Sequence, residues 1–255
     1  MGHFADALKQ TSRLDALLVS RGLAASRERA RALILAGHVR VNGERAAKAG
    51  HAVALDANVT LIEPDHPYVG RGGVKLAHAL DVFEIEVAGR LALDVGASTG
   101  GFTDVLLRRG AARVVAVDVG HGQLDWTIRN DPRVVVLERI NARSLAPEQL
   151  PLDAREFGVV TMDLSFISLR QVLRAIVPLL GPAADLVLLV KPQFEAGREE
   201  VGKGGLVQDP AVHARVVEEV AAAADALGLT RTAMTESPIT GTEGNREFFL
   251  HLRHG

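Results

Sequence analysis

Two charged residues follow apolar runs in the second half of the chain, at positions where strands would end. Asp163 comes after Val159–Met162, and Lys191 comes after Leu186–Val190. The ends of parallel strands meet at one edge of an open α/β sheet, where ligands bind. A lysine can activate a hydroxyl if its pKa is depressed or its ammonium stabilises an oxyanion, and a nearby carboxylate can orient the amine. The pair therefore predicts chemistry on a hydroxyl, although each residue alone is equally typical of a solvated strand end.

A glycine-rich turn lies upstream, between an apolar run and an amphipathic one. Leu91–Val95 runs into Gly96, Gly100 and Gly101, and a helical pattern follows from Phe102 to Arg109. These residues predict a buried strand, a tight turn and a helix start whose N–H groups are open to a ligand. The turn can be purely structural, the nucleophile elbow of a hydrolase, or a cofactor turn.

The hydrolase interpretation makes Ser98 a nucleophile, because Gly96 to Gly100 satisfies G-x-S-x-G. Asp163 and then His213 or His251 follow in a suitable chain order. The position of the turn disfavours this interpretation, because several strands precede the nucleophile of a hydrolase and Leu91–Val95 is the first clear strand of this sheet.

Two acidic residues favour S-adenosylmethionine (SAM) as the ligand of the turn. Asp118 ends the next apolar strand, where a carboxylate can accept both ribose hydroxyls of an adenosine. Asp94 suits the amino group of a methionine tail and would repel a pyrophosphate. The spacing G-x-G-x-x-G, typical of dinucleotide sites, is absent. The cofactor residues expected from this interpretation are Asp94, Gly96, Ser98, Thr99, Gly100, Gly101, Phe102, Asp118, Val119, Asn141 and Ala142.

Strand-like and helix-like runs alternate around these residues, which predicts a mostly parallel sheet with helices on both faces. The expected strands are Leu91–Val95, Val114–Val117, Val134–Leu137, Val159–Met162, Leu186–Val190 and a final antiparallel edge strand over Arg246–Leu252. The expected helices are Gly73–Val82, Phe102–Arg109, Leu169–Leu179 and Val212–Leu227.

A smaller α+β domain is expected over residues 1–64. Leu14, Leu17 and Leu18 suit a short helix, and a second helix begins at the N-cap Ser26 and ends at Gly37. A hairpin follows at Asn42–Gly43. Pro64 and Pro67 interrupt regular structure, so residues 65–70 are expected to form a linker to an α/β domain over residues 71–255.

Composition narrows the class of protein. The chain has 255 residues, 47% hydrophobic and 24% charged, which is typical of a globular protein with a sizeable core. No apolar run approaches a membrane span, and no signal-peptide h-region or histidine metal motif is present. Cysteine is absent, which fits the cytoplasm. Residues 1–64 carry 9 Lys and Arg against 6 Asp and Glu, and the remainder carries 20 against 25.

Longer motifs make a resemblance specific. D-V-G-A-S-T-G-G-F-T-D, V-D-V-G-H-G-Q-L, D-L-S-F-I-S-L, V-K-P-Q-F-E, V-G-K-G-G-L-V-Q-D-P and G-N-R-E-F-F occur in order. Together they resemble the TlyA, or hemolysin A, family of bacterial rRNA 2′-O-methyltransferases, which is related to FtsJ-type enzymes. R-L-D-x-L-L, S-R-x-x-A and G-x-V-x-V-N-G resemble an S4 RNA-binding domain. The resemblance implies a Rossmann-like SAM-dependent methyltransferase fold behind an S4-like domain.

The resemblance also implies a catalytic tetrad, which transfers by motif to Lys75, Asp163, Lys191 and Glu247. By this resemblance Lys191 would activate a ribose 2′-hydroxyl, and the substrate would be a cytidine in ribosomal RNA. Asp163 and Glu247 would hold Lys191, and Lys75 would assist. Periodicity alone points to neither Lys75 nor Glu247.

The partner implied is ribosomal RNA or a ribosomal subunit. Arg13, Arg27 and Arg31 are expected to contact phosphates, because positions 27 and 31 share one helix face, and Arg71 would extend this basic track. The Gly202–Gly205 loop is expected to be mobile and to close over cofactor or RNA. The alternatives are a non-catalytic S4-domain RNA-binding protein and an esterase that uses Ser98.

Overall fold

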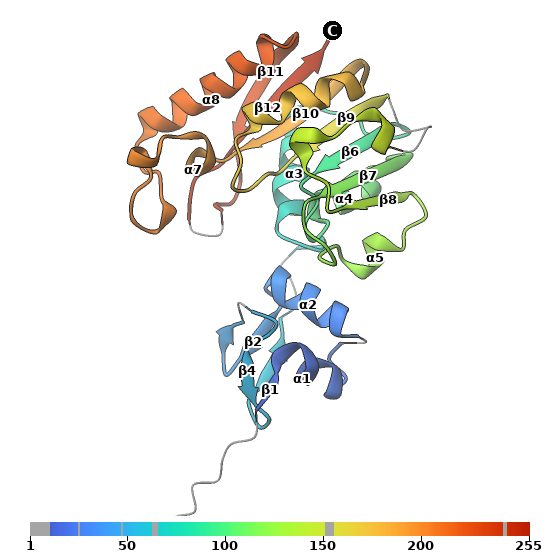
Figure 1. Ribbon diagram of the computed structural model, residues 1–255, viewed down its shortest axis with the longest axis vertical. Coiled ribbons are helices and arrows are strands. Elements are labelled where there is room, and N and C mark those ends of the chain that lie inside the picture. The colour runs from blue at the N-terminus through green and yellow to red at the C-terminus, as the bar shows by residue number, and fades with distance from the viewer. Residues whose placement is uncertain (1–10, 25, 47, 63–65, 151–155, 242–243) are drawn as a thin grey trace, which may run out of the picture.

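A computed structural model describes residues 11–24, 26–46, 48–62, 66–150, 156–241 and 244–255. A small N-terminal α+β domain lies at one end of a larger α/β domain (Figure 1). The expected domain boundary at residue 64 lies outside the described residues.

The N-terminal domain packs two helices against short strands. The Ser26 side chain caps α2 by accepting the Arg29 N–H, and Gly37 ends the helix at a φ of 80°, so both predicted helix limits are confirmed. Leu14, Leu18 and Ile34 are at most 2% exposed in the core of this domain. Its elements are β1 (Thr11–Arg13), α1 (Leu14–Ser20), α2 (Arg27–Ala36), β2 (Val39–Val41), β3 (Glu44–Arg45), β4 (Ala52–Ala54) and β5 (Val59–Leu61).

The described part of the larger domain holds a 7-stranded sheet in the order β11-β12-β10-β9-β6-β7-β8. Five neighbouring strands of this sheet, β10, β9, β6, β7 and β8, are parallel to one another. Strand β12 is antiparallel to both of its neighbours, β10 and β11. The strands are β6 (Leu91–Val95), β7 (Arg113–Asp118), β8 (Val134–Glu138), β9 (Phe157–Met162), β10 (Leu180–Val190), β11 (Leu229–Glu236) and β12 (Phe248–His254).

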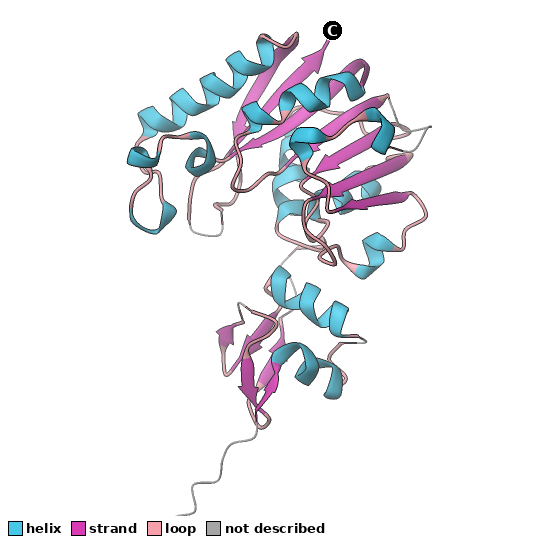
Figure 2. Cartoon of the chain, viewed as in Figure 1, coloured by secondary structure: helices cyan, strands magenta, loops and turns pink. Residues whose placement is uncertain are grey.

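Helices cover both faces of this sheet (Figure 2), and strand alternation decides which face each residue joins. Leu93 and Val95 pack with α6 and α8 on one face, while Ala92 of the same strand packs with α3 and α4 on the other. The helices are α3 (Gly72–Val82), α4 (Gly101–Arg108), α5 (Trp126–Arg129), α6 (Leu173–Ile176), α7 (Pro192–Glu195) and α8 (Pro210–Asp225). Short 3₁₀ turns are η1 (Ala142–Ser144), η2 (Pro147–Gln149), η3 (Leu169–Gln171), η4 (Val177–Leu179), η5 (Arg198–Glu200) and η6 (Lys203–Gly205).

Three expectations from the sequence need correction. The predicted helix Leu169–Leu179 is divided into η3, α6 and η4, because Pro178 has no N–H to continue α6. The final strand is antiparallel as predicted but lies inside the sheet, because β11 covers its outer side. The sequence prediction missed β11, whose residues after Leu229 are mostly exposed and lack an apolar alternation. None of the described helices has the length and hydropathy to cross a membrane.

Candidate active site

The register of the sheet brings distant site residues to one edge. Gly96 follows β6, Asp118 ends β7 and Asp163 follows β9 at the same level. Because β10 and β12 are antiparallel, with Val190 opposite Phe248, Lys191 after β10 lies beside Glu247 before β12. From β6 the chain adds β7 and β8 on one side and then crosses to β9 on the other, and ligands bind at such a switch point.

The glycine turn is held against its neighbours by backbone contacts. Gly96 has a φ of +89°, and a Cβ there would lie 2.3 Å from the Asp163 carbonyl oxygen, so only glycine fits. The Ser98 N–H donates to Asp118 Oδ2 at 2.8 Å, and the Gly120 N–H donates to Asp118 Oδ1 at 2.6 Å. Asp118 therefore joins the turn after β6 to the turn after β7.

A cavity of about 470 Å³ opens beside this turn, and we call it the turn cavity. Six of the predicted cofactor residues line it: Gly96, Ser98, Asp118, Val119, Asn141 and Ala142. Val119 is apolar yet 73% exposed, which leaves a surface that a flat ring could cover. The sequence prediction missed further wall residues, Gln123, Ile140 and the segment from Leu164 to Ile167 with Gln171. Gln123 and Leu164–Ile167 stand inside the quoted motifs, which could have pointed to them.

Asp94 is not among the described residues that line the turn cavity, and its contact with a methionine amino group stays a prediction. The residue is fully buried, and its two oxygens accept from Thr103 Oγ1 at 2.7 Å and Thr161 Oγ1 at 3.0 Å. Burial raises the pKa of Asp94 to about 7. Its side chain connects β6 to α4 and β9 underneath the turn.

Four other predicted cofactor residues also lie off the wall of the turn cavity: Thr99, Gly100, Gly101 and Phe102. A Cβ on Gly101 would lie 3.0 Å from the Gly73 nitrogen, so this glycine permits close packing of α4 on α3. Phe102 is 3% exposed in the core against Phe249. The glycine motif thus serves both helix packing and the cavity wall. The sequence pattern alone does not show which of its residues has which role.

Neither of the two histidines that the hydrolase interpretation offers as a base is bonded to Ser98. The Ser98 hydroxyl lies 3.4 Å from Gln123 Oε1. His213 Nε2 bonds to the Val207 carbonyl, and His251 Nε2 bonds to Asp185. Both histidines are buried in these contacts, so neither is placed to activate Ser98.

The four residues of the predicted tetrad form two lysine–carboxylate ion pairs. Lys191 Nζ lies 2.6 Å from Asp163 Oδ1 and donates to Ser165 Oγ at 3.1 Å. Lys75 Nζ lies 2.5 Å from Glu247 Oε2, and both of these side chains are buried. Lys75 therefore comes from α3, far away in the chain, to hold the carboxylate beside Lys191.

A second cavity, of about 330 Å³, opens at these pairs, and we call it the lysine cavity. Its lining residues are Ser165, Phe166, Lys191, Gln193, Phe194, Val201, Gly205 and Glu247. Ser165 and Phe166 also line the turn cavity, so the two cavities share a wall. Asp163 lines the turn cavity and Lys191 the lysine cavity, so their ion pair joins the two.

The Gly202–Gly205 loop, predicted to be mobile and to close over cofactor or RNA, is hydrogen-bonded at its C-terminal end. Asn245, which is 1% exposed, accepts from the Val207 N–H at 2.9 Å and donates to the Gly205 carbonyl at 2.8 Å. These bonds tie the loop to the segment that carries Glu247.

The three predicted RNA-binding arginines of the N-terminal domain converge on one carboxylate. Arg13, Arg27 and Arg31 all lie within 3.3 Å of Asp15 Oδ2. Hydrogen bonds led by that from Arg13 hold the pKa of the Asp15 carboxyl well below its usual range. The cluster therefore keeps a net positive charge, but part of that charge is compensated internally.

A third cavity, of about 650 Å³, lies where the two domains meet, and we call it the junction cavity. Arg40, Arg45, Arg71, His38 and His66 line it, and no acidic residue is among the described residues of its wall. The three arginines donate to backbone carbonyls, and within the described residues none has a carboxylate partner.

Comparisons with known proteins agree with this architecture. An FtsJ-like methyltransferase model matches residues 68–254, and an S4 domain model matches residues 12–59. The chain is 52% identical to the 16S/23S rRNA (cytidine-2′-O)-methyltransferase TlyA of Mycobacterium tuberculosis, over 96% of this chain and 91% of that protein. The chain belongs to the TlyA family of FtsJ-like methyltransferases.

Two more TlyA-family relatives span nearly the same length. Hemolysin A of Brachyspira hyodysenteriae is 39% identical over 94% of this chain and 99% of its own. A solved structure described as a hemolysin from Streptococcus thermophilus has a TM-score of 0.74 at 41% identity, covering 96% of this chain and 89% of that one. The predicted fold, a Rossmann-like methyltransferase domain behind an S4 domain, is confirmed.

The cofactor of this TlyA-family methyltransferase is SAM, and the turn cavity fits it. The cavity has the size of a small-molecule site, with an apolar wall at Val119, Ile140 and Ala142. Asp118 and Asn141 add polar groups for a ribose and an adenine edge. These residues would hold SAM, which when bound supplies an electrophilic methyl group.

Proposed function

We propose that this chain methylates the ribose 2′-hydroxyl of a cytidine in ribosomal RNA, using Lys75, Asp163, Lys191 and Glu247. The observation that carries the proposal is the ion pair between Lys191 and Asp163. It joins the turn cavity, which fits the methyl donor, to a cavity with room for an acceptor. A hydroxyl seated against Lys191 would therefore face the donor.

Lys191 would act on the hydroxyl through its charge and its position. A cation next to a hydroxyl stabilises the oxyanion that forms as the hydroxyl proton passes to the Glu247 carboxylate, which lines the same cavity, and the oxygen becomes a better nucleophile. Asp163 and Ser165 fix the direction of the Lys191 amine. Glu247 lines the same cavity and can accept a hydrogen bond from the acceptor ribose, while Lys75 holds the Glu247 carboxylate in place.

The nucleotide and the RNA class rest on the relatives. The TlyA protein of Mycobacterium tuberculosis is named as a 16S/23S rRNA (cytidine-2′-O)-methyltransferase, and it matches nearly the whole of this chain. We extend that substrate to this chain, which as an enzyme of ribosomes would work in the cytoplasm.

RNA recognition would use both domains. The S4 domain supplies Arg13, Arg27 and Arg31, and the junction cavity adds Arg40, Arg45 and Arg71, which have no carboxylate partner within the described part of the chain. Arg71 is the N-cap of α3, the helix that carries Lys75. Phosphates bound in the junction cavity would thus lead the RNA toward the lysine cavity.

The test is methylation of ribosomal subunits with tritiated SAM, followed by mapping of 2′-O-methyl sites. We expect incorporation at cytidine with the wild-type chain. Lack of incorporation into either subunit or its rRNA would overturn the proposal, and incorporation at a base rather than a ribose would overturn the assigned chemistry.

A further inference from the structure

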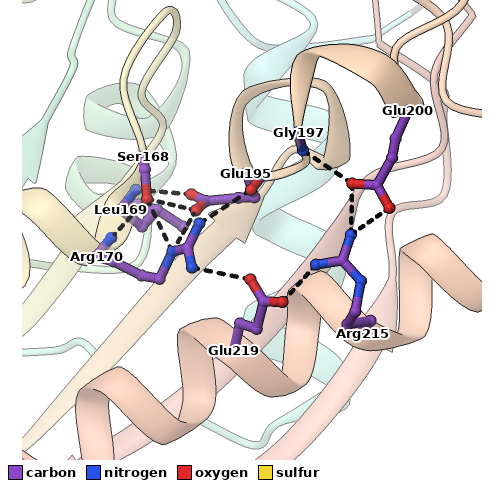
Figure 3. A network of polar contacts seen from close by, with 8 residues as sticks. All are labelled: Ser168, Leu169, Arg170, Glu195, Gly197, Glu200, Arg215 and Glu219. Atoms are coloured by element: carbon purple, nitrogen blue, oxygen red, sulfur yellow. Dashed lines mark hydrogen bonds and ion pairs between the residues drawn. The ribbon is translucent and has the colours of Figure 1, made fainter.

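Glu195 is a buried carboxylate that the proposed reaction does not use. It is the last residue of α7, in the segment that follows Lys191, and it is 5% exposed. Its Oε2 accepts from Ser168 Oγ at 2.5 Å, and its Oε1 accepts from the Leu169 N–H at 2.7 Å (Figure 3). Burial raises the pKa of Glu195. Arg170 Nε also lies 3.3 Å from Oε2. A buried carboxylate is costly to desolvate, so these three contacts call for an explanation beyond general stability.

These bonds connect the two segments that carry Asp163 and Lys191. The loop after β9 leaves Asp163, passes through Ser165 and Phe166, and arrives at Ser168 and Leu169. At its start the loop is held by the Asp163–Lys191 ion pair, and at its end by Glu195. The loop between these points forms the wall shared by the two cavities.

The middle of this loop has a strained backbone conformation at Phe166. Phe166 is 91% exposed and has a φ of +65°, a conformation that costs a non-glycine residue of order 1 kcal/mol or more. Such a conformation persists only when the surroundings impose it. Anchoring at both ends supplies that constraint.

A chain of ion pairs continues outward from Glu195 to α8. Arg170 Nε lies 3.3 Å from Glu195 Oε2, and the same guanidinium donates to the Glu195 carbonyl at 3.0 Å and to Glu219 at 2.8 Å. Glu219 also pairs with Arg215, which binds Glu200 (Figure 3). These outer side chains are more exposed, and exposed pairs contribute little. Glu219 is therefore a matched control: a glutamate bound to the same arginine but without contact to the loop backbone at Leu169.

We propose that Glu195 is a positioning residue for methyl transfer, which clamps the far end of the Asp163 loop and so keeps Asp163, Ser165 and Lys191 in register. The inference rests on the proposed function for its kinetic consequence. Glutamine at this position keeps the two hydrogen bonds to the loop and loses only the ion pair with Arg170: its Oε1 can accept from Leu169 and its Nε2 can donate to Ser168 Oγ.

The kinetic test compares Glu195→Ala, Glu195→Gln and the control Glu219→Gln at saturating SAM and RNA. We expect kcat to fall at least tenfold in Glu195→Ala, and to stay within threefold of wild type in the other two, while the SAM Kd and the Tm of all three change little. An unchanged kcat in Glu195→Ala would overturn the proposal. So would a Glu195→Gln variant as impaired as Glu195→Ala, or a loss of kcat that merely follows a lower Tm and weaker SAM binding.

Ser168→Ala provides a milder variant should Glu195→Ala fold poorly. It removes one of the two bonds, so we expect a two- to fivefold fall in kcat, and no further fall when it is added to Glu195→Ala. Full additivity of the two substitutions would contradict a shared clamp.

Hydrogen exchange tests the clamp without catalysis. Peptides over residues 163–170 should exchange faster in Glu195→Ala than in the wild type, and at the wild-type rate in Glu219→Gln. Equal protection in all variants would overturn the clamp. If the wild-type chain methylates no ribosomal RNA, the proposed function fails, and the exchange result still decides whether Glu195 holds the loop.

Discussion

The turn cavity and the lysine cavity share a wall but are assembled in different ways. The turn cavity is lined by residues that directly follow β6, β7, β8 and β9, with backbone turns and few charges. The lysine cavity depends on ion pairs between residues 28 and 172 positions apart, as in Lys191–Asp163 and Lys75–Glu247. The turn cavity thus depends on local turns, and the lysine cavity depends on long-range ion pairs. Substitutions in the turn cavity should therefore change SAM affinity, and substitutions in the lysine cavity should change methyl transfer.

Lys191→Ala should have the largest effect. Removing the amine should reduce methyl transfer to background, while the SAM Kd stays within about threefold, because Lys191 lies outside the turn cavity. Tritium incorporation and calorimetry measure the two quantities, and Lys203→Ala, an exposed lysine of η6, is the control. Retained transfer in Lys191→Ala would remove the lysine cavity from the chemistry.

Asp118→Ala should show the opposite behaviour. The substitution frees the Ser98 and Gly120 amides and removes an acceptor for ribose hydroxyls. We expect the SAM Kd to rise roughly 30- to 100-fold, about 2–3 kcal/mol, with kcat at saturating SAM largely kept. Calorimetry of SAM binding checks this against Asp131→Ala, whose carboxylate pairs with Arg133 away from the cavity. Equal SAM affinity in both variants would contradict our assignment of the turn cavity.

Arg71→Ala should weaken RNA binding by a smaller factor. Loss of one phosphate contact should reduce affinity roughly three- to tenfold and lower the slope of log K against log salt by about 1. Arg13→Ala should lower affinity less, because Arg13 is bound to Asp15. Binding of an rRNA fragment measured at several salt concentrations separates the two. A larger loss in Arg13→Ala would place the main RNA contact on the S4 domain rather than at the junction.

Asp94→Asn should change the pH dependence of stability. The folded pKa of about 7 lies above the value of 3.8 for an unperturbed Asp, so the folded state binds more protons between these limits. The free energy of unfolding should therefore fall as pH rises from about 4 to 7, and this fall should be weaker in Asp94→Asn, by roughly 1–3 kcal/mol. Denaturant unfolding at pH 4 and pH 7 measures it. Parallel profiles would show that Asp94 does not titrate in this range.

Local patterns in the sequence predicted much of the fold. Leu91–Val95 forms a strand with the predicted limits, and Ser26 and Gly37 mark the ends of α2. Such signals are local, because side-chain alternation and capping act over a few residues. The exposed strand β11 was missed, because it forms by pairing with β12 and has no apolar alternation of its own. The helix interrupted at Pro178 was misjudged although the proline is a local signal.

For the site, the sequence by itself determined which residues follow which strands: Gly96, Asp118, Asp163 and Lys191. It did not distinguish a residue that lines a cavity from one that supports it, as Asp94 and Gly101 show. Only the tertiary structure decided that Lys75 meets Glu247, that Asp15 gathers three arginines and that Glu195 clamps the Asp163 loop. The physical reason is that these contacts join segments far apart in the chain, and strand order, register and burial, rather than local spacing, bring them within bonding distance.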